Sequence, residues 1–263
     1  LGYGYKAPDF RQLYFNFNNA TVGYTVLGYN AVSEVLPQLV DQGQIANIVV
    51  PLSEFNDKLQ AESSIALNLG TDVKFSSEIS TDFNLFFNNI KNLIDTRVIA
   101  NKINGQNVFS YYNINEVITY GLEINSSYKP NNNFKLSAGY QLLFAFDKEG
   151  LRAFNDGEVY ARETTVSPAF QLKKNDYFGL YNRSRHMGYI KLFYENYESK
   201  FNGNIRLTYR SKYGLYDTNN NTYLDVYDDF VKGYVIADLA LNKEINNYSK
   251  IGFGINNVFN FKD

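Results

Sequence analysis

The chain has 263 residues, a formal net charge of −2 and no cysteine, and its aromatic residues are 23 tyrosines and 21 phenylalanines. The absence of cysteine excludes disulfides and thiolate metal sites, and the near-neutral charge argues against a nucleic-acid partner. Tyrosine and phenylalanine fit the pleated, half-exposed surface of a sheet, so this composition favours β structure. No apolar run approaches the roughly 18 residues that a transmembrane helix needs.

Apolar and polar residues alternate with period two along most of the chain, which predicts strands with one apolar and one polar face. In Ser63–Phe75, for example, Ile65, Leu67 and Leu69 alternate with polar or small residues. We expect about nine strands. They are Leu1–Phe10, Ser63–Phe75, Phe83–Asn88, Ile118–Tyr128, Phe134–Phe146, Tyr189–Tyr197, Ile205–Tyr209, Val235–Leu241 and Ile251–Ile255.

The connections between these strands alternate in length. Short polar turns are expected near residues 76–77, 130–133, 199–200 and 246–249, and long loops near 11–61, 97–111, 147–186 and 214–233. Outer-membrane β-barrels have short periplasmic turns and long extracellular loops, whereas loops beyond about 12–15 residues are uncommon in globular domains. The pattern therefore predicts an all-β, antiparallel transmembrane β-barrel. The alternative is a soluble β-sandwich or lectin-like, carbohydrate-binding protein.

Four segments resemble motifs of TonB-dependent outer-membrane receptors. The opening GYGYKAPDFRQLY of residues 2–14 is similar to a family strand motif of the form F/Y-R/K-A-P followed by E/Q-L-Y. LQAESS at 59–64, with NLG at 68–70, resembles another strand start, and NINEVITYGLE at 113–123 resembles a third motif. Near the end, GFGINNVFN at 252–260 is close to the family's penultimate strand. Their order across the chain makes the set specific.

The resemblance implies a 22-stranded barrel with an N-terminal plug inside it. Residues 1–263 would then form a partial barrel of about nine strands, roughly the thirteenth to the twenty-first, without the plug and the closing strand. The family imports scarce ligands such as iron chelates, haem or cobalamin through the bacterial outer membrane, with energy from TonB. A surface lipoprotein is a further partner in related receptors. A passive outer-membrane channel is the alternative within the barrel class.

Within the family, YKAP at 5–8 and NDKL at 56–59 are similar to two short boxes of haem receptors. Lys6 stands where an arginine is usual, and Asp57-Lys58 replaces Pro-Asn. Residues 9–55 also contain no histidine to ligate haem. Tyrosine can ligate haem iron, which makes Tyr14, Tyr24 and Tyr29 candidate ligand contacts. Aromatic packing within a long extracellular loop is the simpler interpretation of the three.

A second candidate contact is the basic cluster Arg183-Ser-Arg-His186, which precedes the strand expected from Tyr189. One histidine cannot build a catalytic triad or a zinc site by itself. At the extracellular end of a strand, Arg183 and His186 would meet ligand or the phosphates of lipopolysaccharide. The simpler interpretation is a solvated strand end.

Residues 217–228 have the ligand spacing of a calcium-binding EF-hand loop. Oxygen-bearing side chains stand at positions 1, 3, 5, 9 and 12, and position 7 offers a carbonyl; the residues are Asp217, Asn219, Asn221, Tyr223, Asp225 and Asp228. Position 6 is Thr222 where glycine is usual, and position 12 is aspartate where glutamate is usual. A solvated Asn/Asp loop tip is the alternative, because these residues favour turns.

No pattern in the sequence predicts an enzyme. The sequence contains no nucleophile motif, no phosphate-binding glycine loop and no cofactor fingerprint. Asp82, Glu116, Glu123 and Asp238 lie on the polar faces of predicted strands, where a barrel presents its wet lumen.

Overall fold

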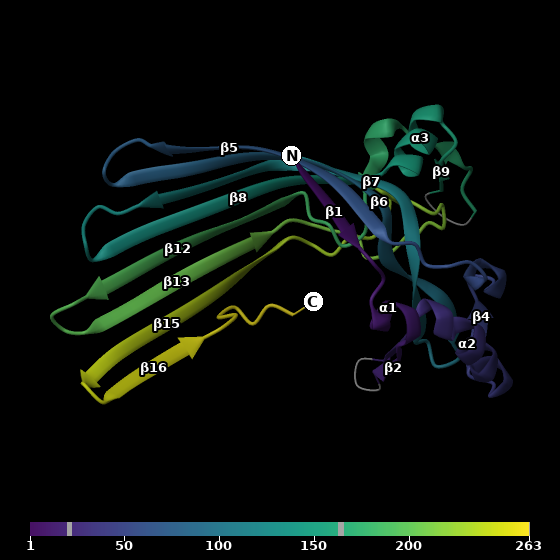
Figure 1. Ribbon diagram of the computed structural model, residues 1–263, viewed down its shortest axis with the longest axis horizontal. Helices are drawn as coiled ribbons and strands as arrows, with labels where there is room; N and C mark the ends of the chain where they lie inside the picture. The colour runs from purple at the N-terminus through teal and green to yellow at the C-terminus, as the bar shows by residue number, and fades with distance from the viewer. Residues whose placement is uncertain (20–22, 163–165, 263) are drawn as a thin grey trace. The chain divides into compact units, whose positions relative to one another are not determined.

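The computed structural model describes residues 1–19, 23–162 and 166–262. Its main antiparallel sheet has the hydrogen-bonded strand order β1-β5-β6-β7-β8-β12-β13-β15-β16 (Figure 1). The chain folds into two compact units. The first contains 1–66 and 89–117, and the second contains 67–88 and 118–263. Strands β5, β6 and β7 run through both units.

Each predicted strand has a counterpart in the main sheet within the described residues, but several differ from the prediction in length. The strands of the sheet are β1 Gly2–Lys6, β5 Glu62–Lys74, β6 Ile79–Lys102, β7 Asn107–Tyr128, β8 Phe134–Asp147, β12 His186–Asn196, β13 Phe201–Arg210, β15 Tyr234–Asn246 and β16 Ser249–Ile255. The first prediction is too long, because a capping box at Asp9 begins a short helix, α1 Phe10–Tyr14.

The loops carry smaller elements. In the first unit these are β2 Asn16–Asn19, β3 Tyr24–Leu27, η1 Tyr29–Ala31, α2 Val32–Asp41, β4 Ile45–Ile48 and η2 Leu52–Phe55. In the second unit they are α3 Lys148–Asp156, β9 Tyr160–Ala161, β10 Phe170–Gln171, η3 Lys174–Asp176, β11 Tyr177–Gly179 and β14 Leu224–Asp225. No helix among the described residues is both long and apolar enough to cross a membrane.

One predicted long loop, 97–111, is wrong. Strand β6 continues to Lys102 and β7 begins at Asn107, so only a tight turn around Gly105, with φ +82°, separates them. The strands extend because their neighbours satisfy their backbone groups: β4 pairs with β6 and β3 pairs with β7. The pairing partners β3 and β4 come from a distant loop and leave no pattern in the sequences of β6 and β7 themselves. Periodicity therefore underestimated the length of both strands.

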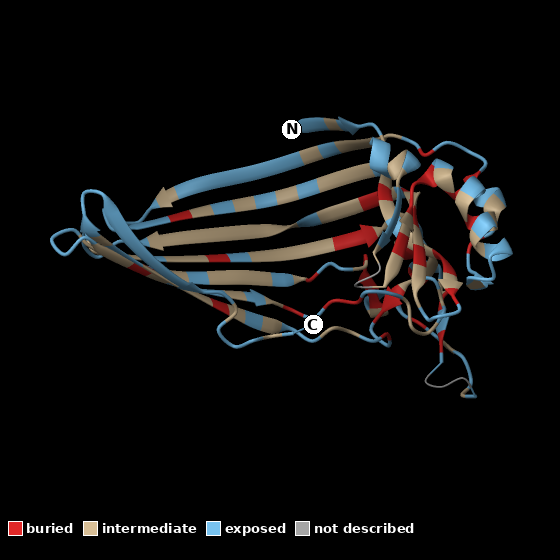
Figure 2. Ribbon diagram, turned by 90° about the horizontal axis from the view of Figure 1, so that it is seen from below, coloured by how far each residue is buried: buried red, intermediate tan, exposed pale blue. Residues whose placement is uncertain are grey.

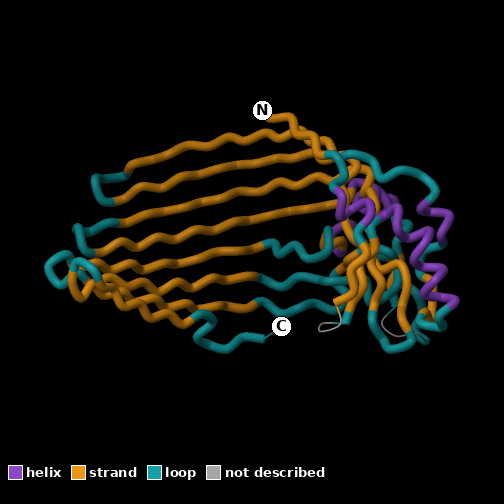
Figure 3. Tube along the Cα trace, turned by 60° about the horizontal axis from the view of Figure 1, so that its bottom comes forward, coloured by secondary structure: helices purple, strands orange, loops and turns teal. Residues whose placement is uncertain are grey.

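Short polar side chains close the predicted tight turns. Ser76 Oγ accepts hydrogen bonds from the backbone N–H groups of Glu78 and Ile79, both at 3.1 Å. Asn131, Asn196 and Asn246 accept from the backbone in the same way in the other three turns. Serine and asparagine favour such turns because their side chains replace backbone hydrogen-bond partners. Figure 3 shows these turns joining neighbouring strands of the second unit at one end.

Strand register gives the second unit an apolar face and a polar face. Tyr189 on β12 is opposite Thr208 on β13, and Thr208 is opposite Ile236 on β15. Because side chains alternate across a strand, odd-numbered residues of β12 share one face with even-numbered residues of β13 and β15. The other face carries Ile190, Leu192, Leu207, Val235 and Leu239. Figure 2 shows that few residues along these strands are buried, as in a single sheet with two open faces.

Each unit has a small hydrophobic core built from its loops. In the first unit Leu27, Val32 and Leu36 pack with Ile99 and Val108, and all five are fully buried. In the second unit Phe146, Phe154, Leu172 and Tyr177 form the centre of another cluster. The rings of Phe154 and Tyr177 stack with centroids 4.8 Å apart. The long loops are therefore folded structures with their own cores.

Candidate functional site

A polar recess in the first unit has a volume of about 750 Å³, and we call it the loop recess. Its lining comes from η1, from η2 and the segment that follows it, and from β6 and β7. The lining residues are Tyr29, Glu54, Asn56, Asp57, Lys58, Gln60, Arg97, Tyr112, Asn113 and Asn115. The haem-box-like segment 56–59 therefore contributes three of its residues to this recess. Its size lies in the range typical of small-molecule sites.

Asn113 on β7 fixes one wall of the loop recess. Its Oδ1 accepts a hydrogen bond from the backbone N–H of Gln60 at 2.7 Å, and its Nδ2 donates to the Gln60 carbonyl at 3.0 Å. The same Nδ2 donates to the Asn92 carbonyl at 2.8 Å. Asn92 has a positive φ of 54°, a backbone conformation that asparagine tolerates better than most residues. One amide thus holds the irregular segment before β5 against the sheet.

Charges in the loop recess balance. Arg97 donates to Glu54 Oε2 at 3.0 Å, and its guanidinium lies 4.8 Å from the centroid of the Tyr112 ring. Asp57 and Lys58 add one charge of each sign. Arg97 Nε is buried and has no hydrogen-bond partner among the described residues. The recess therefore offers donors and acceptors with no net charge, which suits a polar ligand rather than an apolar one.

The three candidate tyrosines have different surroundings. Tyr29 is 7% exposed and donates to the Glu54 carbonyl at 2.9 Å, and burial raises the pKa of its hydroxyl. A raised pKa disfavours the tyrosinate that would bind iron. The Tyr24 ring packs against Phe17 and Phe109. Tyr14 is 54% exposed beside Phe10 on α1, so it is the most accessible of the three. Their role as ligand contacts stays a prediction.

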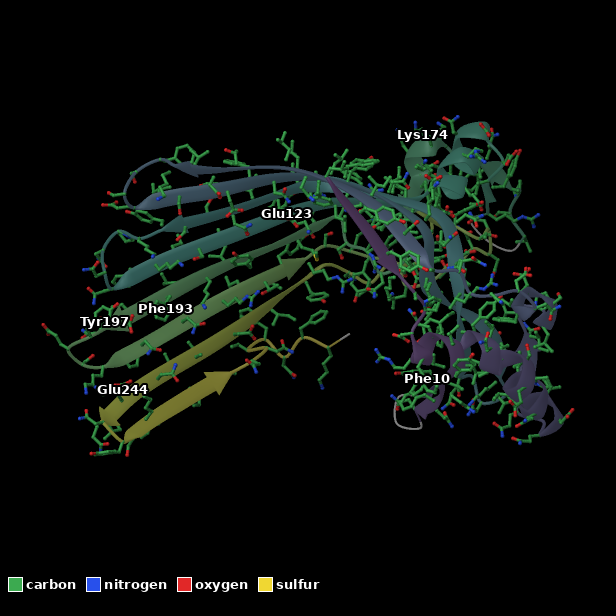
Figure 4. The ribbon with its side chains drawn as sticks, viewed as in Figure 1. Phe10, Glu123, Lys174, Phe193, Tyr197 and Glu244 are labelled. Carbon is green, nitrogen blue, oxygen red and sulfur yellow. The ribbon has the colours of Figure 1, made fainter. Side chains whose placement is uncertain are left out.

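The polar face of the second unit carries a row of hydrogen bonds between strands. Glu123 on β7 accepts from Asn84 at 3.1 Å and from Gln141 at 2.7 Å, while Asn125 donates to Asp82 at 2.9 Å. Tyr189 donates to Asn125 at 3.4 Å. Glu123 lies in the middle of this sheet, as Figure 4 shows. Two of the carboxylates that periodicity placed on polar faces, Asp82 and Glu123, are thus paired with side-chain amides in this row, which we call the polar wall.

Arg183 and His186 belong to the second unit. Arg183 is exposed in the segment before β12. His186 begins β12 opposite Leu142, and its Nδ1 lies 2.7 Å from the Tyr140 hydroxyl. Register places His186 on the same face as Tyr140 and Ile190, which is the apolar face. Its contact with a ligand inside a barrel stays a prediction.

Backbone hydrogen bonds fold the acidic loop 217–228. Asp217 accepts from the N–H groups of Asn219, Asn220 and Thr222. Asp228, 6% exposed, accepts from Thr218 N at 2.7 Å, Asn219 N at 3.2 Å and Asp225 N at 2.8 Å. In these contacts the two carboxylates act as hydrogen-bond acceptors that hold the loop in its folded conformation. No group of three His, Cys, Asp or Glu residues within the described parts of the chain is arranged to hold a metal, and the calcium site stays a prediction.

The apolar face of the second unit has aromatic residues at both ends. Near the short turns Phe134, Tyr194 and Phe201 form a row, with Phe134 and Tyr194 centroids 4.7 Å apart. Near the long loops Tyr140 and Tyr209 occupy the same face. From Phe134 to Tyr140 the strand rises about 20 Å, and from Phe201 to Tyr209 about 27 Å. Membrane barrels present an apolar band of about 25 Å between two aromatic girdles, which is the arrangement on this face.

A sequence model described as the TonB-dependent receptor-like β-barrel matches residues 1–258. The chain belongs to the TonB-dependent receptor family. Proteins of this family are bacterial outer-membrane β-barrels that act as receptors and transporters, not enzymes. The family assignment confirms the predicted fold class and outer-membrane location. It contradicts the alternative of a soluble β-sandwich.

Solved structures of three TonB-dependent receptors share this fold. The copper transporter OprC is 12% identical, with 98% of this chain and 30% of that chain covered and a TM-score of 0.55. A variant of the ferric enterobactin receptor PfeA from Pseudomonas aeruginosa is 16% identical, with 98% and 32% covered and a TM-score of 0.55. The siderophore receptor PirA from the same organism is 14% identical, with 99% and 35% covered and a TM-score of 0.51.

This TonB-dependent receptor chain therefore spans about a third of the solved structures that it matches. No curated protein sequence matches it. Sequence reasoning did not single out Arg97 and Asn113 in the loop recess, because their partners Glu54 and Gln60 are 43 and 53 residues away in the chain. The nearest signals were the NDKL segment and the family motif that begins at Asn113, neither of which gave these two residues a role in a site.

Proposed function

We propose that the protein imports a scarce, polar nutrient through the bacterial outer membrane in a TonB-dependent process. The observation that carries this proposal is the family assignment of nearly the whole chain, together with a sheet that has one apolar and one polar face. An apolar outer face suits lipid, and a polar inner face suits a wet lumen through which a ligand passes.

In this proposal the loop recess captures the ligand. It lies among the folded loops of the first unit, and loops of this kind carry the binding residues of many proteins. Arg97, Lys58, Asn115 and the two acidic side chains provide hydrogen bonds to a polar ligand. Tyr14, Arg183 and His186 are secondary candidate contacts outside the recess.

The proposed cargo is a metal chelate with a polar surface, either an iron chelate or cobalamin. Three similar structures are named for copper, ferric enterobactin or a siderophore, which supports a metal-containing cargo. Haem is less well supported. The haem-box-like segment departs from the family pattern at Lys6 and Asp57-Lys58, and the recess that it lines is polar and charge-balanced. A porphyrin face needs an apolar slot.

The proposed partners are TonB, reached through a plug domain, and a surface lipoprotein that covers the extracellular loops. Both follow from the family resemblance. Lipopolysaccharide is a third proposed partner, because basic residues lie at the extracellular end of β12.

The test is uptake of ⁵⁵Fe-labelled siderophores and ⁵⁷Co-labelled cobalamin by the native host, with and without TonB. We expect TonB-dependent uptake of one of these probes and at least a tenfold loss in Arg97→Gln, because a charged hydrogen bond is worth about 1.5–3 kcal/mol. The matched control is Lys250→Gln, which removes one partner of a surface ion pair with Glu244 near a short turn. Figure 4 labels Glu244 at that end of the sheet.

Uptake that persists without TonB would favour the passive-channel alternative. Equal uptake in Arg97→Gln and Lys250→Gln would remove the loop recess from the proposal. Absence of uptake for every metal probe would overturn the proposed cargo class.

A further inference from the structure

Two cations face each other on the polar face of the second unit. Lys191 on β12 is directly opposite Arg206 on β13, and these two strands lie side by side in the sheet (Figure 1). Register places both side chains on the face that carries Tyr189 and Thr208, which is the polar face. Neither cation makes an ion pair or a side-chain hydrogen bond with any residue that the structure describes.

Like charges in this arrangement repel. In an antiparallel pair the Cβ atoms of directly opposite residues are about 4.5–5.5 Å apart, so two cations there destabilise the sheet. Asp238 on β15 is directly opposite Arg206 on its other side, but its Oδ1 accepts a hydrogen bond from the backbone N–H of Asn257 at 3.0 Å. A negatively charged group placed between Lys191 and Arg206 changes this repulsion into attraction.

The two cations lie halfway along their strands. Lys191 is the sixth of the 11 residues of β12, which has a long loop at one end and a short turn at the other. Ionisable residues at this depth of a membrane protein face a water-filled cavity, and they mark the path of a substrate or ion. The depth of Lys191 and Arg206 therefore indicates a role in the lumen rather than in the loops.

The ring of Tyr189 lies flat against the sheet beside these cations. Tyr189 is directly opposite Gly139 on β8, and a Cβ atom on Gly139 would collide with its ring. Its hydroxyl reaches across β8 and donates to Asn125 on β7 at 3.4 Å. One face of the ring therefore rests on Gly139, and the other is directed away from the sheet. The Arg206 guanidinium lies 5.5 Å from the ring centroid, so a flat aromatic surface adjoins the charge.

These residues border a recess of about 450 Å³, which we call the wall recess. Its volume lies in the range typical of small-molecule sites. The part of its lining on the polar face includes Asn125, Gly139, Tyr189, Arg206, Thr208 and Ile236. A ligand in the wall recess meets an aromatic ring and an aliphatic side chain together with positive charge. This combination suits a flat apolar group that carries a negative charge.

We propose that the wall recess binds an aromatic anion of the cargo, meaning a ring that carries a carboxylate or phenolate oxygen, during passage through the lumen. The ring stacks on Tyr189, and the charged oxygen lies between Lys191 and Arg206. This inference rests on the proposed import function, and it narrows the cargo to an anionic chelate with aryl groups. The wall recess holds the cargo in transit, whereas the loop recess captures it.

The test is ¹⁹F NMR of the purified full-length protein in mild detergent with three small probes. The probes are 5-fluorosalicylate, which is an aromatic anion, fluoroacetate, which is an anion without a ring, and 4-fluorobenzyl alcohol, which has a ring without charge. We expect the wild type to bind 5-fluorosalicylate about tenfold more tightly than either of the other two, because only this probe uses both the ring and the cations.

Two variants separate the charge from the ring. Lys191→Gln combined with Arg206→Gln should weaken 5-fluorosalicylate binding about tenfold. Tyr189→Leu should weaken it about fivefold and leave the binding of fluoroacetate unchanged. The matched control is Lys74→Gln, which removes an exposed cation of β5 outside the wall recess and should leave all binding unchanged. Resistance to SDS without heating shows that each variant has folded, and Tyr189→Met replaces Tyr189→Leu if the latter has not.

Equal binding of 5-fluorosalicylate by the wild type and the double variant, or equal binding of all three probes, would overturn the proposal. So would a wild type that binds none of them; a double variant with lower thermal stability would then assign the two cations to a contact within the protein. The import function is tested separately. Probe binding without TonB-dependent uptake would refute import and keep the anion site, whereas uptake without probe binding would refute only the anion site.

Discussion

Substitution of Asn113 by alanine gives the sharpest test of how the loop recess is held. The change removes three hydrogen bonds, two to the backbone of Gln60 and one to the carbonyl of Asn92. Each is worth about 0.5–1.5 kcal/mol net, and Gln60 is exposed, so we take the lower half of the range and expect a loss of about 2 kcal/mol. This loss raises the population of the opened segment about 30-fold.

The assay is native-state hydrogen exchange of the full-length protein, read at the Gln60 amide. We expect exchange to accelerate about 30-fold in Asn113→Ala. Asn113→Asp keeps the acceptor for the Gln60 N–H but loses both donated bonds, so its effect should be smaller. The control is Asn101→Ala, which removes a side-chain bond to Asn107 in the same unit and should leave Gln60 unchanged. Unchanged Gln60 exchange in Asn113→Ala would refute this account of the recess wall.

Four further predictions concern the second unit. Asp228→Ala leaves the N–H groups of Thr218, Asn219 and the buried Asp225 without their acceptor and should raise proteolysis of loop 217–228, with a local loss of about 3 kcal/mol. Unchanged cleavage would contradict this account of the loop. Burial raises the pKa of Asp217, so its contribution to loop stability is full below its ordinary value of about 4 and is lost as the pH rises through the raised pKa. Protection of the amides of loop 217–228 from hydrogen exchange, corrected for the effect of pH on the intrinsic exchange rate, should therefore fall between pH 4 and pH 7. The fall should be larger in the wild type than in Asp217→Asn. Terbium luminescence tests the calcium site, and we expect the signal to be competed by calcium and absent in Asp217→Asn. Gly121→Ala would place a Cβ in collision with the Leu142 carbonyl oxygen and should cost about 3 kcal/mol or more, measured as lost resistance to SDS.

Local chemistry alone predicted where each strand of the main sheet lies and where four of its tight turns are. The period-two alternation is a property of neighbouring residues, so β5, β8 and β12 can be predicted without tertiary information. The same holds for Ser76 and the asparagines of the turns, whose side chains act within three residues of their own position. The motif order was enough to indicate the receptor family.

Only the tertiary structure decided what depends on contacts between distant segments. Strands β6 and β7 extend because β3 and β4 return from a loop to pair with them. The loop recess joins Glu54 and Gln60 to Arg97 and Asn113, and strand register sets Gly188 between Tyr140 and Tyr209 on the apolar face. A shift of one residue in the register between two strands changes every pair of facing residues. Alternation within a single strand therefore cannot predict the register.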